Sequence, residues 1–303
     1  MKKVKLGQLV SIQTGKLDAN AAVFGGKYPF FTTAKEISRI NEYAYDGEVV
    51  LVAGNGDLNV KYYKGKFNAY QRTYILTSNS NVRMKYLYYF LDKYIEVLRY
   101  QSIGGVIKYI KLNNLSDAQI PMRSILEQDK IIGILEKLDN EIIIRSKQLS
   151  ELSNLVKSRF NEMFGDVILN EKEWKVSKWN EILTIRNGKN QKQVEDADGK
   201  FPIYGSGGIM GYAKDWIVKK NSVIIGRKGN INKPILVREN FWNVDTAFGL
   251  EPVLEKINSE YLFYFCQLYN FEKLNKAVTI PSLTKSDLLN ISIPLPPLAL
   301  QNE

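Results

Sequence analysis

The stretch SILEQDKIIGILEKLDNEIIIRSKQLSELSNLVKSRFNEMF, residues 124–164, decides the fold of this chain. It contains no proline, and its single glycine, Gly133, comes early. Apolar residues recur in alternating steps of four and three, which is the pattern of a helix that lies against another helix. Arg145 and Arg159 fill two positions of this seam. We predict a helix–helix interface formed by Ile131, Leu135, Leu138, Ile142, Arg145, Leu149, Leu152, Val156 and Met163.

A single helix over this stretch would be about 60 Å long, far longer than an ordinary globular helix. The alternative is a helix packed along its own domain, but so narrow and long an apolar stripe suits a seam better. A charged residue at a seam position, here Arg145, would favour one register or one partner at some cost in stability.

The composition limits the classes of protein to which the chain can belong. Its 303 residues allow two domains of ordinary size, and 45% hydrophobic residues argue against disorder. No apolar run is long enough to span a membrane, and polar residues interrupt the basic N-terminus, so neither a transmembrane helix nor a signal peptide is expected. The single cysteine, Cys266, excludes a disulfide framework and a Cys-based zinc site, so we expect a cytoplasmic location.

The charged and titratable residues narrow the function further. Histidine is absent, which excludes Ser-His-Asp and Cys-His nucleophiles, histidine metal ligands and the usual general base near neutral pH. The formal net charge of +10 favours a polyanionic partner, although on charge alone a solvated basic surface with no partner is about equally good an explanation. Because no basic amphipathic helix with a strong apolar face stands out, we expect this partner to be nucleic acid rather than a membrane.

The chain is a tandem repeat with a displacement of 173 residues, the separation of Gly15 from Gly188. Within the aromatic segments the displacement grows by two, so that Tyr86–Phe90 meets Tyr261–Phe265. One displacement recurring along the chain predicts two copies of one domain. Residues that meet an identical residue 173 positions later are Ile12, Gly15, Lys16, Gly26, Lys27, Pro29, Val50, Gly56, Asn59, Thr73, Leu115, Ile120, Pro121 and Gln128.

Each half has the same predicted plan. Two β-rich stretches, residues 48–63 and 221–237, break at a Gly/Asn-rich turn, as expected for a hairpin. A helix rich in aromatic residues follows, over 84–101 and 259–275, and its aromatic side chains are assigned to the core. A loop then leads to a short strand ending in Ile-Pro. The sequence therefore predicts an α+β fold of two tandem domains with small twisted sheets, joined by one long coiled-coil-type helix.

This plan resembles the specificity subunit of type I restriction–modification systems. The resemblance covers the whole chain and rests on LGQLVSIQTGK, KYPFF, the junction of the Ile-Pro strand with the long helix, and their second copies. It implies a first target-recognition domain at 1–123, a conserved helix and connector at 124–170, a second target-recognition domain at 171–297, and the start of a truncated second helix at 298–303.

The family resemblance also implies partners and cofactors. Each domain would read one half of a bipartite double-stranded DNA site, and the helix would dock methyltransferase subunits, to which restriction subunits attach. S-adenosylmethionine, ATP and Mg²⁺ are expected on those partner subunits, and no cofactor on this chain. The family has a second long helix, and this chain ends where that helix would begin. An artificially shortened chain, a truncated or split gene product, and self-association through the exposed helix all remain open.

Polar and basic residues on turns between strands are the DNA-binding candidates, because phosphate contacts supply affinity and contacts to base edges supply specificity. For any single residue, ordinary surface chemistry is the simpler interpretation, but each turn as a group favours DNA. In the first half the candidates are Asn55, Asn59, Lys61, Lys64, Lys66, Gln71, Arg72, Lys108 and Tyr109. In the second half they are Arg227, Lys228, Asn230, Asn232, Lys233, Thr279, Ser282 and Lys285.

Enzymatic alternatives find little support in the sequence. A phosphate-binding P-loop and the motifs of amino-methyltransferases are absent. Asp166, Glu173 and Lys175 imitate an acidic metal-dependent nuclease site, although a charged connector is the simpler interpretation. We therefore expect a non-catalytic DNA-recognition subunit. The alternatives are a stand-alone DNA-binding or regulatory protein of the same architecture and, from another class, a nuclease that uses these three residues.

Overall fold

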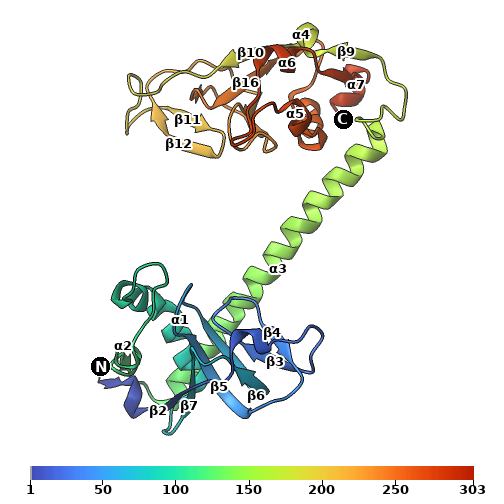
Figure 1. The fold of residues 1–303 in the computed structure, drawn as a ribbon. Helices are drawn as coiled ribbons and strands as arrows, with labels where there is room; N and C mark the ends of the chain where they lie inside the picture. Colours follow the sequence, from blue (N-terminus) through green and yellow to red (C-terminus); the bar gives the residue numbers. More distant parts are fainter. Residues whose placement is uncertain (1) are drawn as a thin grey trace. The chain divides into compact units, whose positions relative to one another are not determined.

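The computed structural model describes residues 2–303, which form two compact units, one extending to Lys147 and the other starting at Gln148. The first unit contains a six-stranded sheet in the order β2-β7-β5-β6-β3-β4, antiparallel except for the β6–β3 pair (Figure 1). The strands are β2 (Val10–Thr14), β3 (Tyr28–Phe31), β4 (Ser38–Ile40), β5 (Tyr45–Ala53), β6 (Val60–Ala69) and β7 (Thr73–Ser78).

Helix α1 (Met84–Gln101) packs on β5 and β6 of this sheet. Alternation along β5 explains the layering, because successive side chains of a strand point to opposite faces. Val50 and Val52 join Leu87 and Leu91 of α1 in one buried cluster, whereas Leu51 lies in a second cluster. The remaining elements are β1 (Lys3–Lys5), which pairs with β8 (Gln119–Pro121), α2 (Leu112–Ser116), and the 3₁₀ turns η1 (Leu6–Gln8) and η2 (Ala19–Ala21).

The second unit repeats this plan. Its four-stranded sheet has the order β10-β16-β13-β14, and a three-stranded sheet has the order β12-β11-β15. The strands are β9 (Val176–Lys178), β10 (Leu183–Asn187), β11 (Phe201–Gly205), β12 (Gly208–Ala213), β13 (Ser222–Gly226), β14 (Ile235–Val237), β15 (Trp242–Asn243), β16 (Ala247–Pro252) and β17 (Ser292–Pro294), which pairs with β9. The helices are α4 (Trp179–Ile182), α5 (Ser259–Leu268), η3 (Phe271–Leu274), α6 (Lys285–Leu289) and α7 (Leu298–Gln301).

Gly15 and Gly188, which are equivalent in the two domains, show why some residues are the same in both. A Cβ added to Gly15 would lie 2.1 Å from the carbonyl oxygen of Ala69, and one added to Gly188 would lie 1.8 Å from that of Val244. Any side chain there would displace the backbone of the facing segment, so the turn after β2 and the turn after β10 both require glycine. The predicted duplication is confirmed at the level of backbone geometry.

Helix α3 (Ile125–Phe164) is the predicted long helix, and its first turn is capped. Ser124 Oγ accepts a hydrogen bond from the Glu127 N–H at 3.3 Å, and the Glu127 carboxylate accepts one from the Ser124 N–H at 3.0 Å. This reciprocal pair is a capping box, which fixes where the helix starts. The helix ends at Phe164, and the next residue, Gly165, has a φ of 69°, which lies in the left-handed region that favours glycine.

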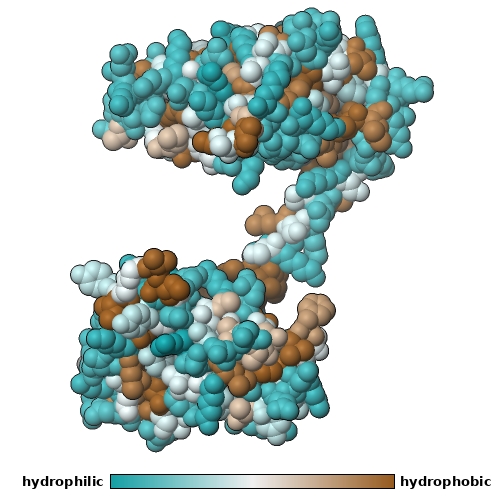
Figure 2. Space-filling view, in the orientation of Figure 1, coloured by the Kyte–Doolittle hydropathy of each residue, from teal (hydrophilic) through white to brown (hydrophobic). Residues whose placement is uncertain are grey.

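The middle of α3 exposes the apolar seam that the sequence predicts. Leu138, Ile142 and Leu149 are 54%, 63% and 69% exposed, and Figure 2 shows apolar side chains along this stretch. The ends of the predicted seam behave differently. Ile131 packs against the core of the first unit and Met163 against that of the second, because the two ends of the helix lie on the domains. The exposed stripe is therefore shorter than the predicted seam.

The second aromatic helix is shorter than predicted. The prediction of a helix over 259–275 is wrong beyond Leu268, where α5 ends, and a separate 3₁₀ turn begins at Phe271. The Asn270 side chain accepts a hydrogen bond from Glu272 N–H, and the Asn232 side chain accepts one from Phe271 N–H at 2.8 Å. These side chains satisfy the backbone in a new turn, as Asn commonly does at helix starts.

The assignment of the aromatic side chains to the core is confirmed for most of them. Tyr86, Tyr261 and Phe265 are buried, and Tyr88, Phe90, Phe263 and Tyr264 are partly buried against the same cores. Tyr89 is the exception, because its hydroxyl donates to the Asp139 carboxylate of α3 at 2.8 Å.

Candidate nucleic-acid interface

In the first unit, the turn between β5 and β6 meets the loop that follows α1. Asn55 and Tyr109 form a β-bridge between these two segments. The Gly56 N–H donates to the Lys108 carbonyl at 2.9 Å, and the Ile110 N–H donates to the Gly54 carbonyl at 2.9 Å. Backbone pairing on both sides of the bridge holds the two segments as one rigid corner, which we call the first corner.

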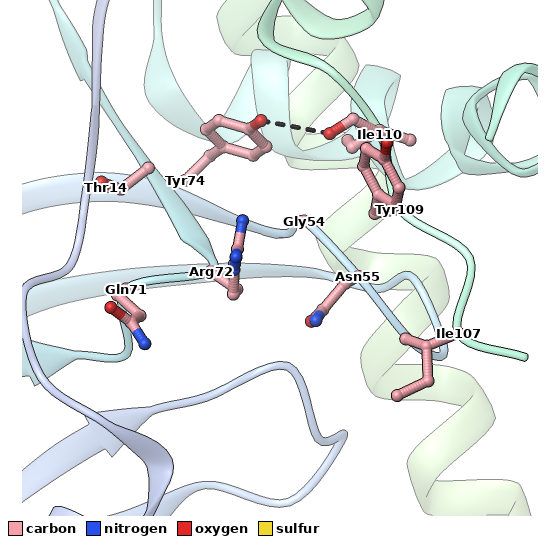
Figure 3. Close-up of a pocket in the computed structure, with 9 residues that line it drawn as sticks. All are labelled: Thr14, Gly54, Asn55, Gln71, Arg72, Tyr74, Ile107, Tyr109 and Ile110. Atoms are coloured by element: carbon pink, nitrogen blue, oxygen red, sulfur yellow. Dashed lines mark hydrogen bonds between the residues drawn. The ribbon is translucent and has the colours of Figure 1, made fainter. Parts of the chain in front are cut away.

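A cavity of about 510 Å³ opens at the first corner. Figure 3 shows the side chains of Asn55, Arg72 and Ile107 around it, each from a different segment. Tyr74 lies at its wall, where its hydroxyl donates to the Ile110 carbonyl at 3.2 Å and burial raises its pKa. The lining residues are Thr14, Gly54, Asn55, Gln71, Arg72, Tyr74, Ile107, Tyr109 and Ile110.

The second unit builds the same corner from the equivalent residues. Lys228 and Ser282 form the β-bridge. The Gly229 N–H donates to the Pro281 carbonyl at 3.0 Å, and the Leu283 N–H donates to the Arg227 carbonyl at 2.9 Å. The Arg227 guanidinium lies 5.7 Å from the centre of the Phe248 ring, within range of a cation–π contact. We call this junction the second corner.

The two corners have the same backbone arrangement but carry different side chains. Each bridge and each flanking hydrogen bond of the first corner has its counterpart 173 residues later, as in the pair Asn55 and Lys228. At the bridge the first corner offers an amide and a phenol, and the second an ammonium and a hydroxyl. Asp245 stands in the second half where Arg72 stands in the first. One scaffold therefore presents two different sets of hydrogen-bonding groups.

Several of the DNA-binding candidates form hydrogen bonds within their own domain. Asn59 Nδ2 donates to the Thr33 carbonyl at 2.8 Å, and Lys61 Nζ donates to the Ala34 carbonyl at 2.7 Å, so both tie a neighbouring loop to the hairpin. Partial burial lowers the pKa of Lys61. Asn232, the counterpart of Asn59, accepts from Phe271 N–H as described above. These three side chains are engaged with the protein backbone.

The remaining candidates divide between the corners and other places. Lys64 and Lys66 lie at the far end of the β5–β6 hairpin, opposite Glu48 and Asp46, so they do not join the first corner. Gln71 lines the first cavity, where its amide donates to Asp18 at 2.9 Å. Exposed side chains in the turns and loops that meet at the second corner, or close to them in sequence, are Asn230, Lys233, Thr279 and Lys285.

The corners contain residues that the candidate set omits. Thr14 and Tyr74 line the first cavity from β2 and β7, and nothing in their local sequence distinguishes them from other strand residues. Ile107 also lines it, and an aliphatic residue beside two glycines in a polar loop was a signal that could have been used.

The connector after α3 does not form a nuclease site. The Asp166 carboxylate accepts hydrogen bonds from Ile168 N–H at 2.8 Å and Leu169 N–H at 3.0 Å, so it shapes a turn. Across residues 2–303 no group of three or more Asp, Glu or Cys side chains is placed to hold a metal ion. Over the same residues, the helices are too short or too polar to cross a membrane.

Two copies of one domain, each presenting a rigid corner of polar and basic side chains, define a two-site recognition protein. The chain belongs to the family of the type I restriction modification DNA specificity domain, whose model matches residues 1–154 and 171–303. It is thus a non-catalytic specificity subunit of the type I kind. This confirms the resemblance inferred from the repeated motifs and sets the nuclease alternative aside.

Individual relatives agree with this assignment. The chain is 28% identical to the type I restriction enzyme EcoDI specificity subunit of Escherichia coli, in a match covering 100% of this chain and 79% of that protein. It is 24% identical to the MjaVIII specificity subunit of Methanocaldococcus jannaschii, over 98% and 83%. The crystal structure of the type I S subunit from M. genitalium shares the fold, with a TM-score of 0.72 and 20% identity over 99% of this chain and 86% of that one.

Proposed function

We propose that each corner of this chain reads one segment of a bipartite double-stranded DNA target. The observation that carries the proposal is the paired bridges, Asn55 with Tyr109 and Lys228 with Ser282, which place different polar groups on the same backbone frame. Sequence is read by side chains that reach base edges from a rigid support, while neighbouring cations bind phosphate. Arg72, Lys108 and Arg227 supply the cations in this scheme.

In this proposal the exposed apolar stripe of α3 binds either the methyltransferase subunits or the helix of a second copy of the chain. The support is an apolar surface on the described part of the chain with no covering segment: Leu138, Ile142 and Leu149 are all more than half exposed. A contiguous apolar surface of this kind marks an interaction site. S-adenosylmethionine, ATP and Mg²⁺ belong to the partner subunits, through which restriction subunits join the complex, and the complex acts in the cytoplasm.

The test is DNA binding by the chain in complex with its methyltransferase subunits, measured by fluorescence anisotropy at several salt concentrations. Lys228→Ala should weaken binding, and the slope of log K against log salt should fall by about one if Lys228 contacts a phosphate. Arg72→Ala should weaken binding through the first corner. Both side chains are exposed, so folding should be unaffected.

Matched controls lie on the same elements. Lys220 precedes β13 and Lys228 follows it, so Lys220→Ala removes the same charge at the opposite end of one strand. Arg39 lies on β4, at the sheet edge farthest from β2, and Arg39→Ala matches Arg72→Ala. If the controls weaken binding as much as the corner variants, the DNA is held by general surface charge and the assignment of the corners is wrong.

A further inference from the structure

The loop that follows α1 carries two adjacent aliphatic side chains that are largely exposed. Val106 is fully exposed and Ile107 is 62% exposed. Figure 2 shows hydrophobic surface over this loop. Single exposed apolar residues are ordinary, but these two are adjacent, and Ile107 also lines the cavity of the first corner.

The second unit repeats the feature with different residues. Val278 is fully exposed and Ile280 is 59% exposed, on the loop that ends at the second corner. Ile280 is the counterpart of Ile107, 173 residues later. One exposed isoleucine is therefore common to both domains, and each has an exposed valine close beside it at a different position: Val106 meets Thr279 and Val278 meets Gly105.

Hydrogen bonds hold both loops at their base. In the first loop Ile103 and Tyr109 exchange backbone hydrogen bonds of 3.0 and 2.8 Å. In the second, the Asn275 side-chain oxygen accepts from Ala277 N–H at 2.9 Å and from Ser282 N–H at 3.1 Å. These bonds hold the backbone on both sides of each tip.

The charge around the tips indicates which partner they meet. Lys108 follows Val106 and Ile107 directly, and Arg72 stands across the same cavity. The nearby acid Asp57 is ion-paired with Arg99 at 3.0 Å, which leaves the cations of the corner without a local counter-charge from it. An apolar tip flanked by cations suits a surface that is anionic outside and apolar between its stacked layers, which describes duplex DNA.

We propose that Val106–Ile107 and Val278–Ile280 are wedges that insert between adjacent base pairs of the two half-sites. Apolar side chains used in this way unstack a base step and kink the duplex, and the unstacking is offset by the additional protein surface that the bent DNA contacts. The inference rests on the proposed function of the corners. It adds that each half of the target is distorted, so that its deformability as well as its base edges is recognised.

The experiment uses the full chain with its methyltransferase subunits and a duplex recovered by selection from a randomised pool. 2-Aminopurine placed at successive positions reports unstacking, and end-to-end energy transfer reports bending. With the wild-type chain, the fluorescence of 2-aminopurine should increase at one base step in each half-site. The double variant Val106→Ser, Ile107→Ser should remove the signal in one half-site only and weaken binding about tenfold. Val278→Ser with Ile280→Ser should remove the other.

Two controls separate the wedge from loss of any apolar surface. Leu254 is 52% exposed beyond the end of β16, at the opposite end of that strand from the second corner, and Leu254→Ser should change neither signal. Replacement of Val106 and Ile107 by leucine keeps an apolar tip and should restore both unstacking and affinity.

Four results would overturn the inference. A wild-type complex that binds an unbent, fully stacked duplex would remove the wedge and leave the proposed function intact. Replacing thymine by uracil in the duplex, if it reproduces the loss seen in the serine variants, would assign the tips to thymine methyl groups. Serine variants that bind DNA normally but lose the methyltransferase subunits would make the tips a protein-docking surface. Absence of all DNA binding would overturn the proposed function together with the wedge.

Discussion

The side-chain oxygen of Gln128 accepts a hydrogen bond from the backbone N–H of Arg83 at 2.9 Å. Gln128 lies in the first turn of α3, and Arg83 is the residue before α1, so one buried amide joins the starts of two helices. In the second unit, Gln301 makes the same contact with the N–H of Asn258, also at 2.9 Å. This clasp is the same in both domains and lies where each Ile-Pro strand turns into a helix.

Replacing Gln128 by alanine should destabilise the first domain by about 1–3 kcal/mol, because buried backbone groups would lose their partners. The amide also donates to the Arg123 carbonyl at 2.9 Å, so both of its ends are used. Urea unfolding followed by circular dichroism would measure the loss. Gln267→Ala, at an exposed position of α5, is the control and should change stability little. Equal stability of the two variants would show that the hydrogen bonds of Gln128 do not stabilise the domain.

Leu138→Glu or Leu149→Glu should prevent association through α3 without unfolding the chain, because both leucines are more than half exposed. A buried charge opposite an apolar partner is costly unless it is paired. Light scattering of the chain alone and with its methyltransferase subunit would give the mass of each complex. Lys137→Glu introduces the same charge on a neighbouring exposed position and should associate as wild type does. A wild-type chain that stays monomeric and ignores the methyltransferase subunit would refute the docking role.

The sequence was sufficient for the long helix and the duplication, because both are encoded by regular spacing. Local hydrogen bonds limit what spacing can predict: the α5 helix stops at Leu268 because Asn270 and Asn232 satisfy the backbone of a new turn. The second of these bonds joins residues far apart in sequence. The capping box of Ser124 and Glu127, in contrast, was readable as a short motif.

The corners were harder to predict than the fold. Asn59 and Lys61 have the composition of a DNA-binding turn, yet their side chains reach the carbonyls of Thr33 and Ala34. No sequence pattern announces which polar side chain will turn inward, because that depends on where a distant loop exposes its backbone. Tyr109 was predicted from its loop, but its pairing with Asn55 emerges only once α1 returns the chain to the hairpin turn.

The stability of the second domain should depend on pH through the buried thiol of Cys266. Burial raises the pKa of its thiol well above the usual value, so the native state holds the proton where an unfolded chain would lose it. Protons bound by the folded form make stability fall as the pH rises above about 8.5. We expect the urea midpoint of the second domain to fall between pH 8 and 9.5. The Cys266→Ala variant should be less stable overall, but its urea midpoint should fall less steeply with pH. An equally steep fall in this variant would show that Cys266 does not cause the pH dependence.

Exchanging the residues at the two bridges should exchange base preference. Asparagine pairs in a bidentate manner with adenine, whereas lysine favours the O6 and N7 acceptors of guanine. Because Asn55 and Lys228 occupy the same place on one backbone frame, Asn55→Lys should move the first half-site towards guanine at one position. Lys228→Asn should move the second half-site towards adenine. A good bidentate pair is worth about 1–3 kcal/mol, which corresponds to roughly 5- to 150-fold in relative affinity.

Selection from a randomised pool, followed by sequencing, would show whether the preference changes at one base pair or at none. Lys220→Asn makes the same substitution at the other end of β13 and should leave the selected sequence unchanged. Weakening of binding to every sequence alike by Lys228→Asn would mean that Lys228 contacts a phosphate. In that case the bases of the second half-site would be read by other groups of the second corner, such as the Ser282 hydroxyl on the opposite side of the bridge.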